Sequence, residues 1–338
     1  MRVVVTGASG FLGRLLVREL LRTRSFAGTP VTGLVLVDRV DLPDQPGGTD
    51  PVVRTVTGDL VEHLAEVFAE PVDVVFHLAA AVSAECEADF DLGMRANVDA
   101  TRALLEAARV QAARGGSVAR VLFTSSLAVY GPPAGSEPGS PVSEATLAVP
   151  RSSYGTQKLM CEHLIADMTR RGFVEGRVAR LMTVAVRPGR PNAAASGFVS
   201  GIIREPLAGR PTVCPVALDL RVALASPRTT IRSVLRIAET ERGSTGGAEA
   251  ALPVNVPGLT VSVADMLATL RQVAGAAVAD LVTVAPDPAV TALVGSWPAH
   301  VDNRRAAELG LLPDPSFEAV VRDYLAAHPE AVSRPPRP

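Results

Sequence analysis

Tyr154 and Lys158 are the pair of residues whose types and spacing most directly suggest chemistry. They stand four positions apart, so on a helix both side chains would project from the same face. A free tyrosine has a pKa of roughly 10 and is a poor base at neutral pH, but a nearby positive charge favours the phenolate. A tyrosine beside a lysine could therefore accept a proton from a substrate hydroxyl. The alternative for an isolated YxxxK pattern is an ordinary pair on a surface helix.

Ser126 strengthens the chemical interpretation of this pair. It follows an apolar stretch, Arg120–Thr124, that has the character of a buried strand. A serine at the end of such a strand could hydrogen-bond the same substrate oxygen and hold it in place. The three residues together predict removal of a hydroxyl proton, which requires an acceptor for the hydride that leaves the same carbon.

A glycine loop near the start of the chain could bind such an acceptor. Gly7, Gly10 and Gly13 follow a short apolar run and open a helical pattern. Glycines permit a tight turn and close backbone approach, and a helix N-terminus offers unpaired N–H groups to a pyrophosphate. The spacing is GxxGxxG and not the GxGxxG of the commonest dinucleotide fingerprint. By themselves, three glycines at a turn could equally be structural.

Asp38 favours the dinucleotide interpretation of this loop. It ends the next apolar run, where a carboxylate can accept hydrogen bonds from the adenine ribose and repel a 2′-phosphate. NAD is therefore predicted over NADP, although Arg39 would suit a phosphate and a strand-end carboxylate can simply be solvated. With the serine, tyrosine and lysine, the loop indicates an enzyme that moves a hydride between a hydroxyl-bearing carbon and a nicotinamide. The positive nicotinamide would add to the lysine in favouring the phenolate.

The elements that must position these residues follow an alternating pattern. Short apolar runs alternate with helical patterns in the first half of the chain, which predicts an α/β protein with a parallel sheet covered on both faces. Near-continuous Val and Leu runs fit strands buried on both faces. The predicted strands are Arg2–Thr6, Leu34–Asp38, Arg54–Thr57, Val72–His77, Arg120–Thr124 and Val178–Val186. The Pro-, Gly- and Ser-rich stretch 132–150 predicts a loop just before Tyr154.

Composition limits the classes of partner and the compartment. The net charge of −2 without a basic stripe argues against nucleic acid. The most apolar windows are too short for a membrane span, which needs about 20 residues, and no secretory signal is evident. The three cysteines match neither a zinc site nor a disulfide framework. A cytoplasmic protein is expected, and a homodimer is an assembly that the sequence allows.

The chain is expected to contain two lobes. We predict a dinucleotide-binding domain over residues 1–186 that carries the Ser/Tyr/Lys set, and a smaller, partly irregular substrate-binding lobe over 187–328. Frequent prolines break up the pattern of the second lobe. The boundaries are approximate, because segments can interleave. Residues 329–338 are expected to be a disordered tail.

These motifs as a set resemble the extended short-chain dehydrogenase/reductase family, the NAD-dependent epimerase/dehydratase group. The matching stretches are 6–13 (TGASGFLG), 58–60 (GDL), 77–80 (HLAA), Asn97, 124–131 (TSSLAVYG), 154–158 (YGTQK) and 187–189 (RPG). The resemblance implies a doubly wound sheet of the Rossmann type, with Ser126, Tyr154 and Lys158 as catalytic residues. It also implies a set of residues that bind NAD. This set comprises Gly7, Ser9, Gly10, Phe11, Leu12, Gly13, Asp38, Asp59, Leu60, Leu78, Ala79, Ala80, Asn97, Tyr154, Lys158 and Pro188.

Among the NAD residues, some roles rest on the resemblance alone. It implies that Asp59 and Leu60 border the adenine, that Ala79 and Ala80 line the cofactor path, and that Asn97 supports the active-site helix. For each of these residues the alternative is strand-end packing or helix capping.

A narrower resemblance points to the substrate. Residues 187–198, 204–209, 89–93 and 296–298 resemble a branch of this family whose members use NAD to oxidise the C2 hydroxyl of a four-carbon sugar acid, D-erythronate, to the 2-oxo acid. A carboxylate substrate calls for an arginine. The candidate arginines are Arg187, Arg190 and Arg232, and the candidate hydroxyl contacts are Ser83, Asn192 and Ser126. Trp297 is expected to be a packing residue.

Two other functions stay open at this point. A nucleotide-sugar epimerase or dehydratase would use the same Ser/Tyr/Lys chemistry but return the hydride to its substrate. The second lobe is short for a site that holds a diphosphate and a base. A non-catalytic dinucleotide sensor on the same fold is an alternative of another class, but such proteins generally lose the tyrosine or the lysine, and both are present here.

Overall fold

A computed structural model of the protein describes residues 1–40, 49–131, 140–189, 194–241 and 252–331. Two compact units with interleaved segments make up the chain. Unit 1 consists of residues 1–126, 153–180 and 231–254, and unit 2 of residues 127–152, 181–230 and 255–338. No helix among the described residues is long and apolar enough to cross a membrane.

The units differ from the expected division at three places. Residues 127–152 and 181–186 lie in unit 2, although they precede the expected boundary, and residues 231–254 return to unit 1. The returning segment is held there by two buried or half-buried arginines of unit 1. Arg120 Nη1 donates to Ala238 O at 3.2 Å, and Arg177 Nη2 donates to Thr240 O at 2.7 Å. These long-range backbone contacts have no signature in the local sequence pattern. Of the expected tail, residues 329–331 form a short 3-10 turn and 332–338 lie outside the described residues.

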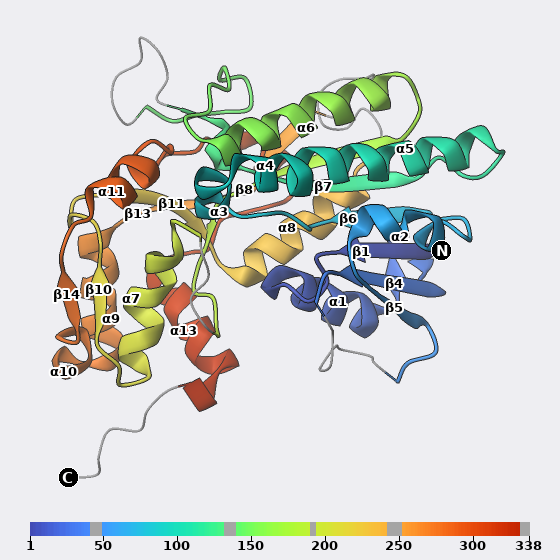
Figure 1. The fold of residues 1–338 in the computed structure, drawn as a ribbon. Helices are drawn as coiled ribbons and strands as arrows, with labels where there is room; N and C mark the ends of the chain where they lie inside the picture. Colours follow the sequence, from blue (N-terminus) through green and yellow to red (C-terminus); the bar gives the residue numbers. More distant parts are fainter. Residues whose placement is uncertain (41–48, 132–139, 190–193, 242–251, 332–338) are drawn as a thin grey trace. The chain divides into compact units, whose positions relative to one another are not determined.

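The core of unit 1 is a seven-stranded sheet with the order β12-β8-β7-β6-β1-β4-β5 (Figure 1). Its strands are β1 (Arg2–Thr6), β4 (Gly33–Asp38), β5 (Val53–Thr57), β6 (Val74–His77), β7 (Arg120–Ser126), β8 (Glu175–Leu181) and β12 (Pro253–Asn255). The pairings from β5 through β4, β1 and β6 to β7 are all parallel. The predicted doubly wound α/β sheet is therefore confirmed, with β1 in its interior between β6 and β4.

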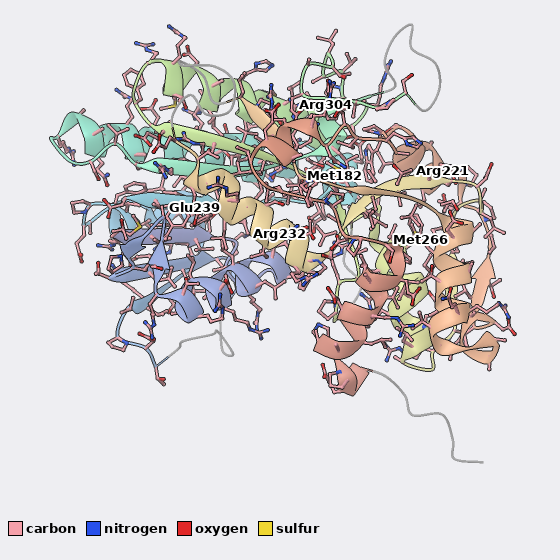
Figure 2. All side chains as sticks on the ribbon, turned by 180° about the vertical axis from the view of Figure 1, so that it is seen from behind. Met182, Arg221, Arg232, Glu239, Met266 and Arg304 are labelled. Carbon is pink, nitrogen blue, oxygen red and sulfur yellow. The ribbon has the colours of Figure 1, made fainter. Side chains whose placement is uncertain are left out.

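One predicted strand, Val178–Val186, is wrong. The apolar run is continuous in sequence but belongs to two sheets. β8 ends at Leu181 in the large sheet, whereas β9 (Thr183–Val184) pairs in parallel with β11 (Arg221–Ala225) in a three-stranded sheet of unit 2. Met182, labelled in Figure 2, is the buried residue between the two strands. A run of apolar residues shows that a segment is buried but not which sheet it joins.

Helices cover both faces of the large sheet (Figure 1). α2 (Leu60–Val67), α5 (Ala100–Ala113) and α6 (Ser153–Arg170) share one buried cluster with Val4 of β1. Because side chains alternate along a strand, the equally buried Val3 and Val5 must face the other side. α1 (Phe11–Thr23) and α8 (Pro227–Glu239) lie on that side (Figure 1).

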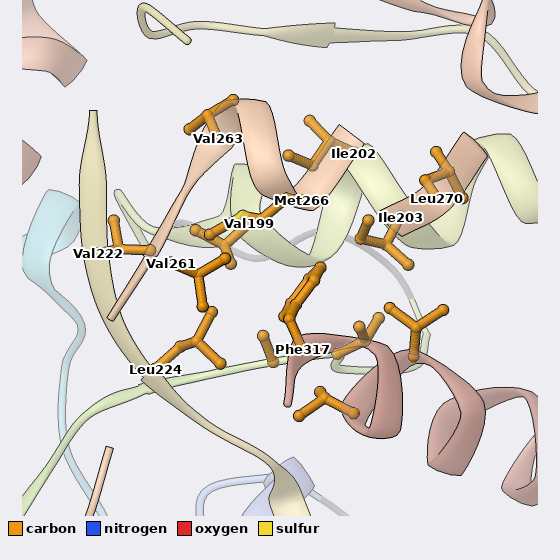
Figure 3. Packing of buried hydrophobic residues seen from close by; sticks show 14 of the residues in the cluster. Val199, Ile202, Ile203, Val222, Leu224, Val261, Val263, Met266, Leu270 and Phe317 are labelled. Atoms are coloured by element: carbon orange, nitrogen blue, oxygen red, sulfur yellow. The ribbon is translucent and has the colours of Figure 1, made fainter. Parts of the chain in front are cut away.

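Unit 2 has a hydrophobic core of its own (Figure 3). Three helices, α7 (Gly197–Leu207), α9 (Val263–Ala274) and α13 (Phe317–Ala327), pack there with β11 and β13 (Leu259–Ser262). Phe317 lies among Val199 and Ile203 of α7 and Leu224 of β11 in this cluster. A separate parallel pair is formed by β10 (Thr212–Cys214) and β14 (Val282–Val284). The expected substrate lobe is thus a packed unit built from short elements.

The remaining elements of the described chain are short. They are β2 (Ser25–Phe26), β3 (Thr29–Pro30), α3 (Ser83–Ala88), α4 (Phe90–Gly93), the π-helix η1 (Met94–Asp99), the 3-10 turns η2 (Leu127–Val129) and η3 (Pro329–Ala331), α10 (Ala276–Ala279), α11 (Pro288–Gly295) and α12 (Arg304–Glu308).

Candidate active site

The candidate residues of unit 1 gather at the carboxyl edge of the large sheet. The glycine loop follows β1, Asp38 ends β4, Leu78 follows β6, and Ser126 ends β7. Parallel strands end at the same edge, so residues far apart in sequence become neighbours there. The strand order reverses at β1, whose successors β4 and β6 lie on opposite sides of it. In open α/β sheets this switch point is where ligands bind.

The glycine loop is packed too tightly to hold side chains. Gly7 has a φ of +71°, and a Cβ added to it would lie 2.7 Å from Ala79 N. A Cβ on Gly13 would lie 2.2 Å from Gly7 O. The first glycine therefore lets the loop pack closely against the turn after β6, and the third lets it pack closely against the start of α1. Both positions require glycine for steric reasons.

The start of α1 fits a pyrophosphate. Gly10 is the N-cap residue, no side chain caps the helix, and its first turn contains no acidic residue. The N–H groups of that turn thus have no competing anionic side chain. Phe11 and Leu12, the first two helical residues, are partly buried at this place. The donor set therefore suits a phosphate-bearing dinucleotide, whereas no cluster of metal-ligating side chains occurs in the part of the chain that the structure describes.

Asp38 is joined to the glycine loop by a hydrogen bond. Its Oδ2 accepts from Ser9 N at 2.9 Å, and its side chain is only partly buried. The carboxylate is thus fixed beside the loop, with Oδ1 accepting only a long 3.4 Å bond from Val40 N. This leaves hydrogen-bonding capacity on the carboxylate, while Arg39 is exposed.

The other predicted NAD residues have varied surroundings. Asp59 is the N-cap of α2, where it accepts from Val61 N at 2.9 Å, and Leu60 is buried in the core below it. In the free chain these two residues therefore have the capping and packing roles that were the alternatives. Leu78 and Ala79 are partly buried and Ala80 is exposed. Pro188 lies in unit 2 and is partly buried there.

Asn97 is buried and anchors α6. It lies in the π-helix η1 and is 2% exposed. Its Nδ2 donates to Gln157 Oε1 at 2.8 Å, and its Oδ1 accepts from Ala81 N at 2.8 Å. The side chain thus connects the segment after β6 with the residue that precedes Lys158. This geometry fits the expected support of the active-site helix.

Ser126, Tyr154 and Lys158 come together in unit 1. A hydrogen bond joins the side chains of Ser126 and Tyr154. Lys158 is 2% exposed, and its Nζ donates to Thr124 O at 2.9 Å. The ammonium stands 5.7 Å from the centroid of the Tyr154 ring and 4.5 Å from that of Phe123. The predicted grouping of these three side chains therefore exists in the fold.

Burial governs the protonation of both groups. It raises the pKa of Tyr154 to about 12; the electrostatic effect of Cys86 acts in the same direction, and the hydrogen bond with Ser126 opposes it. Burial also lowers the pKa of Lys158 to about 8, against the electrostatic effects of Cys161, Cys86 and Glu162. In the free chain, the neighbouring lysine by itself therefore does not bring the pKa of the phenol towards neutral pH. Desolvation disfavours the charged form of each group, and it is the largest cause of both shifts.

A buried ion pair supports this face of α6. Arg180 of β8 contacts Glu162 through Nε at 2.9 Å and Nη2 at 2.6 Å, and Ser125 also donates to Glu162. Both charged side chains are about 5% exposed. Sequence reasoning missed this group. Two features of the sequence could have indicated it. An arginine inside an apolar strand needs an anionic partner, and a glutamate stands one turn after Lys158.

The candidate substrate residues lie in both units, and two of them fall outside the described residues. Ser83 is the first residue of α3 and is buried, and Arg232 is exposed on α8 in unit 1 (Figure 2). Arg190 and Asn192 lie outside the described residues. Arg187 lies in unit 2, where its backbone N donates to Ser200 Oγ at 3.0 Å. Trp297 packs against the hydrophobic cluster of unit 2, as expected.

Arg187 has no anionic partner among the described residues. Burial and the charge of Arg204 lower the pKa of its partly buried guanidinium. The carboxylate of Glu205, which is adjacent to Arg204 in sequence, is already shared, because Arg204 contacts its Oε1 and Arg210 its Oε2, each at 2.7 Å. Unit 2 therefore holds an unneutralised arginine in a partly desolvated place, and such a group favours an anionic ligand.

The chain is similar to known proteins over nearly its whole length. The model of the NAD-dependent epimerase/dehydratase family matches residues 3–232. Two relatives named D-erythronate dehydrogenase align over nearly full length. The protein from Cupriavidus necator is 48% identical and covers 96% of this chain and 98% of its own. The protein from Haemophilus influenzae is 39% identical and covers 96% and 99%.

Solved structures show the same architecture. A structure described as a nucleoside-diphosphate-sugar epimerase from Agrobacterium tumefaciens has a TM-score of 0.87 at 38% identity, covering 98% of this chain and 95% of that chain. L-threonine 3-dehydrogenase from Trypanosoma brucei has a TM-score of 0.82 at 22% identity, covering 98% and 97%. The second similarity concerns the fold alone.

Proposed function

The chain belongs to the NAD-dependent epimerase/dehydratase family, and from that membership we propose that it oxidises the C2 hydroxyl of a small sugar acid with NAD, D-erythronate giving 2-oxo-D-erythronate. The family resemblance inferred from the motifs is thereby confirmed, and the reaction is our proposal. The observation that carries the proposal is the grouping of Ser126, Tyr154 and Lys158 at the carboxyl edge of the sheet that carries the glycine loop. The full-length similarity to two D-erythronate dehydrogenases supports the substrate class.

In this mechanism Tyr154 takes the proton of the C2 hydroxyl. NAD, when bound, supplies the acceptor for the hydride that leaves C2. Ser126 hydrogen-bonds the phenol and would hold the substrate oxygen beside it. Lys158 keeps a positive charge near the ring, with its Nζ fixed on Thr124 O at 2.9 Å. Because the pKa of Tyr154 is about 12 in the free chain, further positive charge must arrive with the ligands before the tyrosine can act as a base.

Two further residues would select the ligands. We assign the substrate carboxylate to Arg187, since of the candidate arginines that the structure describes it is the partly buried one, whereas Arg232 is exposed. A charge-assisted pair at that end of a four-carbon acid would orient C2 for reaction. We assign the choice of NAD over NADP to Asp38, whose carboxylate beside Ser9 N would accept ribose hydroxyls and repel a 2′-phosphate.

A nucleotide-sugar epimerase is the second candidate. It is favoured by the Agrobacterium structure, whose description names a nucleoside-diphosphate-sugar epimerase at 38% identity. Such an enzyme uses the same tyrosine chemistry but forms no net NADH. The two functions therefore differ in an observable product and not only in substrate.

The decisive experiment is a turnover panel. NADH formation should appear with D-erythronate and NAD, and should be weak with the amide or lactone of the acid, with NADP, and with UDP-glucose or UDP-galactose. Arg187→Met should raise the KM for the acid by about tenfold or more, because a hydrogen bond to a charged group contributes about 1.5–3 kcal/mol. Arg232→Met is the matched comparison for the exposed rival arginine and should change KM little. Conversion of a UDP-sugar without net NADH would favour the epimerase. If no substrate is turned over, the result would favour a non-catalytic dinucleotide sensor.

A further inference from the structure

His77 is a buried histidine with a hydrogen-bond partner at each ring nitrogen. It is the last residue of β6 and is 1% exposed. Its Nδ1 lies 2.7 Å from Thr6 Oγ1, and its Nε2 lies 2.9 Å from Thr101 Oγ1. The imidazole therefore joins the end of β1 to α5 through the interior of unit 1. The Ser/Tyr/Lys chemistry does not use this residue.

The partners of the two threonines fix the direction of every bond. Thr101 Oγ1 lies 2.6 Å from Asn97 O, and a carbonyl can only accept, so the Thr101 hydroxyl donates to it. Its oxygen must then accept from His77 Nε2. At the other end Thr6 Oγ1 accepts from Ala79 N at 3.3 Å, so the Thr6 hydroxyl is free to donate to His77 Nδ1. These bonds place a proton on Nε2, and because burial keeps the imidazole neutral, the Thr6 hydroxyl donates to Nδ1.

The two ends of this chain of hydrogen bonds lead to different parts of the candidate site. Thr6 directly precedes Gly7, and Ala79 N is the atom closest to a Cβ built on that glycine. At the other end Asn97 bonds through its side chain to Gln157, which precedes Lys158 on α6. All of these residues lie in unit 1.

We propose that His77 is a positioning residue that couples the glycine loop to the Asn97 turn and to α6. Each member of the chain both accepts and donates, so its polarity is fixed and no member can shift without leaving a buried polar group unsatisfied. A dinucleotide that orders the glycine loop would thereby also order η1 (Met94–Asp99). The coupling does not depend on which substrate the enzyme takes. Burial and the charge of Lys158 lower the pKa of His77 to about 3, so the imidazole stays neutral at working pH.

The first test observes the tautomer directly. The protein is labelled with 15N-histidine, and the His77 signals are identified by their loss in His77→Gln. The expected result is a protonated Nε2 and an unprotonated Nδ1 that do not change between pH 5 and 9. A proton on Nδ1, or titration of the ring near an ordinary histidine pKa, would overturn the proposal.

The second test observes the coupling by hydrogen–deuterium exchange with and without NAD. In the unmodified protein NAD should slow exchange both in residues 7–13 and in 94–99. Thr101→Val keeps the shape of the side chain but removes the link, so the protection of 94–99 should fall by about tenfold while that of 7–13 persists. Thr169→Val is the matched control. It removes a buried hydroxyl on α6 that bonds Ile165 O and Gly176 N outside this chain, and it should keep both protections.

Each result bears on the proposal independently of catalysis. If NAD protects residues 94–99 equally in Thr101→Val and in Thr169→Val, His77 is only a hydrogen-bonded core residue. The same conclusion follows if NAD does not protect residues 94–99 in any form of the protein. Failure of the sugar-acid reaction would appear in the turnover panel and leave this experiment unaffected. If the acid is turned over, kcat of Thr101→Val should also fall by about tenfold relative to Thr169→Val.

Discussion

At the scale of single residues, burial dominates the protonation of the candidate base and of the lysine beside it. Burial raises the pKa of Tyr154 to about 12 and lowers that of Lys158 to about 8. At neutral pH the free protein therefore holds a phenol beside an ammonium. The phenol is ready to donate a proton, as the reverse reaction requires, whereas the oxidation that we propose needs positive charge brought by the ligands.

Replacement of the phenol hydroxyl tests this residue. Tyr154→Phe keeps the ring and its packing but removes the proton acceptor, so kcat with D-erythronate should fall by about 10²–10⁴-fold, with NAD affinity retained. Tyr324→Phe is the matched control, because it removes a buried hydroxyl that has no hydrogen-bond partner in the described chain. Steady-state kinetics and NAD titration measure both effects. A Tyr154→Phe enzyme that turns over within tenfold of the control would exclude the mechanism.

At the scale of elements, α6 carries the chemistry and is held by polar groups inside the protein. Tyr154, Lys158 and Glu162 recur at four-residue spacing along one face of this helix. Asn97 holds the helix from η1, and Arg180 of β8 holds it through Glu162. The helix is thus fixed in rotation as well as in position, which a purely apolar face would specify less sharply.

The Glu162–Arg180 pair predicts a stability effect of this anchoring. Arg180→Met leaves a buried carboxylate without its cation and should lower the free energy of unfolding by about 3–5 kcal/mol. The double variant Glu162→Gln with Arg180→Met should recover much of that loss, because no uncompensated charge remains.

An exposed ion pair on the same helix is the control for this prediction. Arg170→Met breaks the pair with Asp167, whose side chains are 59% and 52% exposed, and should change stability by less than about 1 kcal/mol. Urea unfolding of the three variants measures the differences. Equal losses for Arg180→Met and Arg170→Met would contradict the structural role of the buried pair.

At the scale of the whole molecule, the buried His77 should make stability depend on pH. Its pKa is lowered to about 3 in the folded chain, chiefly by burial, while an unfolded histidine titrates near its usual value of about 6.5. Between these two values the unfolded chain binds a proton that the folded chain does not. The contribution of His77 to stability is therefore fully present above about pH 6.5 and is lost as the pH falls towards 3.

This dependence can be isolated by comparison of slopes. From pH 6 to 4 the unfolding free energy of the unmodified protein should fall more steeply than that of His77→Gln, by up to about 1.4 kcal/mol per pH unit. His163→Gln replaces an exposed histidine and should give a curve parallel to that of the unmodified protein. Denaturant titrations at several pH values provide the slopes. If His77→Gln also ran parallel, His77 would bind its proton in the folded state.

Much of unit 1 could be predicted from the sequence, because its determinants are local. Apolar runs gave β1 its full extent, Arg2–Thr6, and the glycines of the loop follow from steric limits that only that residue satisfies. The four-residue spacing of Tyr154 and Lys158 placed them on one helical face without any knowledge of the fold. The alternation of strand and helix patterns then predicted the parallel sheet that brings Ser126 to the same edge.

The tertiary structure decided what depends on contacts between distant segments. It divided the run Val178–Val186 between two sheets, returned residues 231–254 to unit 1, and paired Glu162 with Arg180. It also set the pKa of Tyr154, because desolvation depends on everything that surrounds a group and not on its neighbours in sequence. Sequence spacing reports which face of an element a residue occupies. Only the folded chain determines what that face meets and how much water remains there.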